Sequence, residues 1–252
     1  IYMNMKGKHT GNKKVRQAIA HLINTNEIID KVFAGVADNV RNDKQGFISW
    51  YTGEAPSQYY PYNVSKAEAL LDSAGYKKDG SGNRFKISII HEQKNSNHPK
   101  VLDIMRSNLK AAGIELDVMK MDASAITEKV HKKMNYDMYI TTIATGPDPD
   151  LLTKSWHSKN IGKGWNANSS GYNNKKIDNL LDNGRGELDP VKRKKMYVEA
   201  HQILAEDIPM LALYGTKWLW TYNEKLDGFP IGYTFRDGLE TVNWDGKIPS
   251  NR

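Results

Sequence analysis

Cysteine is absent from all 252 residues of this chain. Its absence excludes disulfide bonds and thiolate metal ligands. It also weakly favours an exported protein, which gains from having no thiol that could mispair. Long hydrophobic runs are missing as well, since no segment approaches the ~20 consecutive apolar residues that a membrane-spanning helix needs. We therefore expect no helix that crosses a bilayer.

The first residues do not read as a leader sequence either. The chain begins IYMNMKGKHTG, which is neither an initiator methionine with a leader nor a signal peptide. We interpret Ile1 as a cut within a longer protein or as the first ordered residue. With 39% hydrophobic residues, the chain can still build a packed core, as one large domain or two small ones.

Acidic residues are fewer than basic ones, so the formal net charge at pH 7 is +7. A basic chain raises the possibility of nucleic-acid binding. However, Lys and Arg are spread along the sequence, and no RNP, zinc-finger or Gly/Arg-rich pattern occurs. We therefore predict a solvated basic surface and no nucleic-acid partner. A nucleic-acid binder would instead show strongly salt-dependent binding to DNA or RNA.

Catalytic motifs are also missing. None of the seven histidines forms H-x-x-x-H or H-E-x-x-H, and no G-x-S-x-G, P-loop or G-x-G-x-x-G sequence occurs. We therefore expect no metal site and no cofactor.

One pair of carboxylates, Asp148 and Asp150, stands in a suggestive place after Gly146-Pro147. Alternate residues in a Pro-interrupted turn do not usually point at one atom, whereas a glycosidase needs two carboxylates that face each other across a bond. We predict that they organise the turn or cap the following helix by accepting its free N–H groups. The alternative is a carboxylate-dependent hydrolase that uses both.

Apolar residues recur at helical or strand spacing along most of the chain. The pattern predicts helices at 14–34 (with a second start at Asn24), 65–74, 99–112, 123–133, 151–157, 175–184 and 190–206, and strands at 84–91, 114–120, 136–143 and 209–214. Asn24 with Glu27, and Ser65 with Glu68, are predicted capping boxes. The β-α-β-α-β succession from 84 to 143 predicts an α/β lobe in which helices flank the sheet.

Three small residues, Ala144, Thr145 and Gly146, follow the last strand of that succession. In layered α/β proteins, ligands collect at the carboxyl ends of the strands. Small side chains there would let a ligand approach the backbone. We therefore predict that this loop faces a ligand.

Aromatic residues in two loops are further candidates for ligand contact. Trp50 lies in the aromatic segment 36–62, and Trp165, Asn166 and Tyr172 lie in a Gly/Asn/Ser-rich loop. Aromatic walls with a few polar groups suit a pocket for variable ligands. For Trp50 and Tyr172, packing within the protein is the alternative.

Six segments occur in an informative order. They are VRQAIAHLINTNEIIDKVFAG, YNVSKAEALLDSAGY with DGSG, MRSNLKAAGIELDV, PDPDLL, GYNNKKIDNLLD and DPVKRKKMYVEAHQILAEDIPMLALY. From about Asn12 to the end, their order and spacing resemble the carboxyl-terminal half of the family 5 extracytoplasmic solute-binding proteins. These are the oligopeptide-, dipeptide- and nickel-binding components of ABC importers.

The resemblance implies a periplasmic-binding-protein-like lobe with a mixed sheet, one of two lobes that close on a ligand. Residues 1–218 would form most of this lobe, and 219–252 would be a tail that returns to the other lobe, whose amino-terminal part the chain lacks. The implied protein is not an enzyme. It is a receptor, periplasmic or otherwise extracytoplasmic and with or without a lipid anchor. It would deliver a peptide or related small solute to an ABC permease in the inner membrane.

The resemblance also places the loop from Ala144 to Asp150 at the cleft. In peptide-binding members, an acid three residues before the Asp-Pro aspartate pairs with the ligand's α-ammonium group. Thr145 stands there in this chain, and a hydroxyl cannot supply the charge-assisted hydrogen bond that a desolvated ammonium prefers. The sequence therefore does not predict a free peptide amino terminus as the ligand. A blocked or modified peptide, a sugar, an opine-like compound and a chelated metal are the alternatives.

Overall fold

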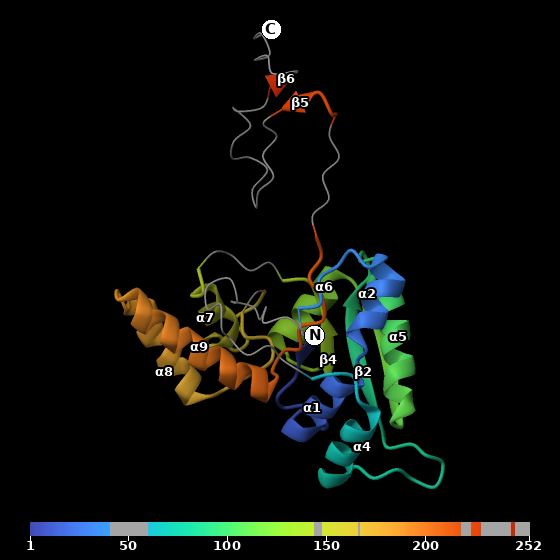
Figure 1. The fold of residues 1–252 in the computed structure, drawn as a ribbon. Helices are drawn as coiled ribbons and strands as arrows, with labels where there is room; N and C mark the ends of the chain where they lie inside the picture. Colours follow the sequence, from blue (N-terminus) through green and yellow to red (C-terminus); the bar gives the residue numbers. More distant parts are fainter. Residues whose placement is uncertain (41–59, 144–147, 166, 218–222, 228–242, 245–252) are drawn as a thin grey trace. The chain divides into compact units, whose positions relative to one another are not determined.

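The computed structural model describes residues 1–40, 60–143, 148–165, 167–217, 223–227 and 243–244 (Figure 1). The chain divides into two compact units, Ile1–Thr216 and Lys217–Arg252. In the second unit, β5 (Leu226–Asp227) pairs antiparallel with β6 (Asn243–Trp244). No helix among the described residues is long and apolar enough to cross a membrane.

A four-stranded mixed sheet forms the centre of the first unit. Its strands are β1 (Tyr2–Met3), β4 (Met138–Ile140), β2 (Phe85–Glu92) and β3 (Ile114–Met121), in that spatial order. β2 runs parallel to both β3 and β4, whereas β1 runs antiparallel to β4. The predicted α/β architecture with a mixed sheet is therefore confirmed.

Helices cover both faces of this sheet, because β2 is apolar on both sides. Ile89 contributes to a core with α1 (Lys13–Leu22), α2 (Thr25–Phe33), α4 (Val64–Ser73) and α5 (His98–Ala111). The next residue, Ile90, points the other way, as alternate strand residues do. It joins a second core with α6 (Ala123–Ile126), the π-helical turn η1 (Thr127–Lys132), α7 (Leu151–Trp156), α8 (Lys175–Gly186) and α9 (Pro190–Asp207).

The predicted capping boxes are only partly right. Asn24 begins α2, and its Oδ1 accepts the N–H of Glu27 at 3.2 Å. The N–H of Asn24, however, donates to the side chain of Asn108 at 3.0 Å instead of to Glu27. The Ser65 cap is wrong, because Asn63 begins α4 and accepts the N–H of Lys66 at 2.9 Å. An asparagine is as strong an N-cap as a serine, so the earlier residue starts the helix.

Two predicted strands also differ from the structure. β4 is shorter than the expected 136–143 at both ends. At its amino end, the N–H of Ser88 in β2 is taken by the side chain of Asp137 at 2.9 Å and not by a continuing strand. The expected strand 209–214 forms only an isolated bridge between Tyr2 and Met210. The two-residue β1 is too short to support a longer ladder.

Candidate functional site

The carboxyl edge of the parallel strands is the part of the lobe where the sequence predicts a ligand. β4 ends at Ile140, and the chain then rises to the surface, where Thr142 and Ile143 are exposed. Ala144, Thr145 and Gly146 come next in the chain and lie outside the described residues. Their contact with a ligand stays a prediction, supported by the exposure of the residues just before them.

An aromatic cluster fixes the elements on both sides of this loop. The ring of Tyr2 stacks on Tyr139 of β4 with centroids 6.4 Å apart, and it packs against Trp156 of α7 at 6.1 Å. Trp156 is buried. Burial raises the pKa of Tyr2 to about 12, so its hydroxyl remains neutral in this apolar setting. The start and the end of the loop are therefore anchored to the same cluster.

Asp148 organises the turn that enters α7. Its Oδ1 accepts the backbone N–H of Asp150 at 2.7 Å and pairs with Nη2 of Arg193 at the same distance. Partial burial raises the pKa of Asp148, but the Asp150 N–H and the charge of Arg193 outweigh it, so that the pKa lies below its ordinary value. The predicted turn-organising role is confirmed for this residue.

Asp150 occupies the N-cap position of α7, but its side chain accepts no backbone N–H of the helix. Its Oδ1 accepts the hydroxyl of Thr153 at 2.7 Å, and its Oδ2 accepts Nε and Nη2 of Arg185 at 2.9 and 2.8 Å. The capping prediction is thus wrong for Asp150, because the guanidinium is a stronger, charge-assisted partner. Asp148 and Asp150 point to different arginines and do not converge on one atom.

Trp165 is the predicted contact residue that the structure leaves open to solvent. It is 50% exposed, and its ring packs edge-on against His131 with centroids 5.4 Å apart. His131 is held by the Ser169 hydroxyl at 2.7 Å, and burial lowers the pKa of this histidine. A buried neutral imidazole therefore fixes one edge of the indole, and the exposed part remains available for contact.

The side chain of Tyr172 packs inside the lobe. It is buried, and its hydroxyl donates to Asp207 at 2.6 Å and accepts from Asn174 at 3.1 Å. Burial, with the Asp207 carboxylate beside it, raises the pKa of Tyr172. These contacts favour the packing alternative. The structure does not bring the rings of Tyr172 and Trp165 together, and ligand contact by Tyr172 stays a prediction.

Asn168 shapes the loop that carries these aromatic residues, and the sequence analysis did not single it out. Its side chain is fully buried, donates to the carbonyl oxygen of Tyr172 at 2.8 Å and accepts the N–H of Tyr172 at 3.1 Å. An asparagine within a Gly/Ser-rich loop is a signal for such a role, because its amide can replace backbone partners.

Trp50 and Asn166 lie outside the described residues, so their predicted ligand contacts stay predictions. Within the part of the chain that the structure describes, no three His, Cys, Asp or Glu side chains gather where they could hold a metal ion.

The mixed sheet with helices on both faces is an α/β fold, and comparison with known proteins identifies the family. The model of the bacterial extracellular solute-binding proteins, family 5, middle region, matches residues 1–164. The chain therefore belongs to this family, which confirms the resemblance drawn from the six segments. The glutathione-binding protein GsiB of Escherichia coli K12 is 27% identical over 246 residues, covering 94% of this chain and 46% of GsiB.

Solved structures agree with this assignment. The oligopeptide-binding protein AppA of Bacillus subtilis, in complex with a nonapeptide, superimposes with a TM-score of 0.74 at 26% identity over 85% of this chain and 44% of AppA. NikZ of Campylobacter jejuni, in complex with Ni(L-His), gives 0.76 at 23% identity over 90% and 46% of the two chains, and shares the fold. The chain thus spans just under half the length of these relatives.

Proposed function

We propose that this chain is part of the solute-binding component of an ABC importer, which captures a peptide or peptide-like small solute in a cleft between two lobes. The family match over residues 1–164 carries the proposal. Two relatives support this ligand class: GsiB is a glutathione-binding protein, and AppA holds a nonapeptide. We infer that the protein is a receptor and not an enzyme.

The proposal assigns residues 1–218 to one lobe and 219–252 to a tail that returns to the other lobe. The other lobe would be built mainly from chain that precedes these residues, in keeping with the coverage of under half of each relative. Solute binding would close the lobes about a hinge, and the ABC permease of the inner membrane would recognise the closed form. The protein would act in the periplasm or another extracytoplasmic space, with or without a lipid anchor.

In this proposal, the loop with Ala144, Thr145 and Gly146 faces the solute, and Trp165 contributes an exposed aromatic surface. Asn166, Tyr172 and Trp50 complete the proposed contacts.

Native mass spectrometry of the full-length protein as purified, followed by denaturing release of any bound molecule, tests this function. We expect a blocked or modified peptide, because Thr145 offers no carboxylate to an ammonium group. A sugar, an opine-like compound or a chelated metal would support the importer function but place the solute outside the peptide class. A released peptide with a free amino terminus would contradict the role given to Thr145 while supporting the importer function. If no molecule is released and a broad thermal-shift screen finds no ligand, the receptor function itself fails.

Asp148→Asn and Asp150→Asn should each change solute affinity by less than roughly threefold, which is under about 1 kcal/mol. Each carboxylate is engaged by its own arginine within the lobe, so neither is set to act on a bound solute. Isothermal titration with the identified solute measures the affinity. Asp103→Asn, on α5, is a matched control because Asp103 also pairs with a neighbouring arginine, Arg106.

The hydrolase alternative predicts a different result for the same two variants. Under it, the unmodified protein turns over its solute, and either substitution abolishes the turnover while the fold is retained. Mass analysis of the solute after incubation with each folded variant separates the two functions.

A further inference from the structure

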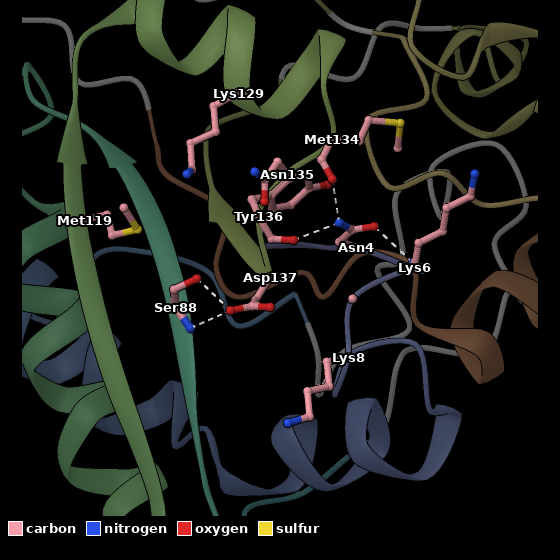
Figure 2. Close-up of a pocket in the computed structure, with 11 residues that line it drawn as sticks. Asn4, Lys6, Lys8, Ser88, Met119, Lys129, Met134, Asn135, Tyr136 and Asp137 are labelled. Atoms are coloured by element: carbon pink, nitrogen blue, oxygen red, sulfur yellow. Dashed lines mark hydrogen bonds between the residues drawn. The ribbon is translucent and has the colours of Figure 1, made fainter.

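A pocket of about 330 Å³ lies on the face of the sheet that η1 covers (Figure 2). Its walls come from the 4–8 segment, Ser88 of β2, Met119 of β3, Lys129 of η1 and the 134–137 turn. Asp137 immediately precedes the amino end of β4, whereas the predicted cleft loop follows the carboxyl end of the same strand. The pocket is therefore separate from the proposed solute site.

The frame of this pocket is held in place by one buried amide. Asn4 is 4% exposed, and its Nδ2 donates to the carbonyl oxygens of Met134 and Tyr136 at 2.8 and 2.7 Å. Its Oδ1 accepts the N–H of Lys6 at 3.0 Å. The amide thus joins two segments that are about 130 residues apart in sequence, so the pocket is formed without a ligand.

Ser88 and Asp137 form a fixed polar group in the pocket wall. Oδ2 of Asp137 accepts both the N–H and the hydroxyl of Ser88, at 2.9 and 2.6 Å, as Figure 2 shows. No described residue donates a hydrogen bond to Oδ1 of the same carboxylate. This oxygen can therefore accept a hydrogen bond from a bound molecule.

The pocket is positively charged. Three lysines, Lys6, Lys8 and Lys129, are among the residues that line it, against the single carboxylate of Asp137, and their formal charges sum to +2. None of the three lysines forms an ion pair with a described carboxylate. Glu128, the neighbour of Lys129 in sequence, is already paired with Lys132 and Lys133. The pocket therefore has cationic donors that no described carboxylate of the lobe neutralises.

We propose that this pocket binds a small hydroxylated anion, with a carboxylate or phosphate group, at a second site outside the solute cleft. The lysine ammonium groups, among them Lys129 from η1, bind the oxyanion through charge-assisted hydrogen bonds. Oδ1 of Asp137 accepts the hydrogen of a ligand hydroxyl. The volume lies at the lower end of the range for small-molecule pockets, which suits a ligand of this size.

Isothermal titration of the full-length protein with citrate and, separately, with glycerol 3-phosphate tests the proposal, with sodium chloride at matched ionic strength as the blank. We expect saturable 1:1 binding of at least one probe, and the stronger probe decides between carboxylate and phosphate. Lys129→Gln and Lys8→Gln should each weaken binding by about tenfold, as expected for loss of one charge-assisted hydrogen bond.

Lys66→Gln on α4 is the matched control, because it removes one exposed lysine charge from a helix that packs on the other face of the sheet. It should leave the affinity unchanged. Asp137→Asn should retain binding of an oxyanion that lacks a hydroxyl group, such as sulfate. The proposal is overturned if neither probe saturates, or if Lys129→Gln and Lys8→Gln bind as tightly as Lys66→Gln.

Discussion

Replacing Arg16 by methionine should lower the free energy of unfolding by about 3–5 kcal/mol, because one buried and two partly buried carbonyl groups lose their donor. Arg16 is 3% exposed in α1. Its Nε donates to the carbonyl oxygen of Asp207 at 2.7 Å, and its Nη1 donates to those of Thr10 and Gly11 at 2.9 and 3.1 Å. The guanidinium thus ties the segment before α1 to the last residue of α9.

Urea unfolding, followed by circular dichroism, measures this loss. Lys14→Met, an exposed change in the same helix, is the control and should stay within about 0.5 kcal/mol of the unmodified protein. Arg16→Lys should recover only part of the loss, because a single ammonium cannot reproduce the planar fork of the guanidinium. If Arg16→Met lowers the free energy of unfolding no more than Lys14→Met does, the three carbonyl groups find other hydrogen-bond donors in the variant.

Acidification from pH 7.5 to 5 should remove about 2 kcal/mol of stability through His201 alone. This side chain is 2% exposed in α9, and no described residue makes a hydrogen bond with its buried Nδ1. Burial lowers the pKa of His201 from 6.5 to about 4. Between these two pH values the unfolded chain binds a proton that the folded chain does not, so stability falls as the pH falls through this window. The loss is negligible above pH 7 and approaches about 3 kcal/mol at pH 4.

His201→Leu removes the titrating group at nearly constant volume and should reduce the loss between pH 7.5 and pH 5 by about 2 kcal/mol. Urea unfolding at the two pH values measures the difference. Tyr197→Phe in the same helix is the control, because burial raises the pKa of Tyr197 to about 12 and the group does not titrate in this range. An equal acid loss in His201→Leu and the unmodified protein would show that His201 is protonated in the folded state without cost.

The predicted elements that agree with the structure depend on residues close together in sequence. The helix expected at 99–112 is α5 (His98–Ala111), and the strand expected at 84–91 is β2 (Phe85–Glu92). In both, the spacing of apolar residues is a local property, and a turn or Pro marks the start. β4 was harder to predict, since the residue at which it begins depends on Asp137 replacing a backbone acceptor for Ser88 on another strand.

In the candidate site, too, contacts between residues close in sequence could be predicted and contacts between distant residues could not. The turn role of Asp148 could be predicted, because its partner Asp150 is two residues away. The arginine that binds Asp150 could not be predicted, since Arg185 is 35 residues further along the chain. Nor does the sequence show that Trp165 lies against His131.

The sequence by itself determined the absence of disulfides, the alternation of helices and strands, and the resemblance to the solute-binding family. These depend on composition, on periodicity and on the order of segments. Only the tertiary structure decided which arginine binds each carboxylate, that Tyr172 packs inside the lobe, and that Asn4 and Ser88 meet around a cationic pocket. Those contacts join residues far apart in the chain, and their geometry exists only when the sheet and the helices pack together.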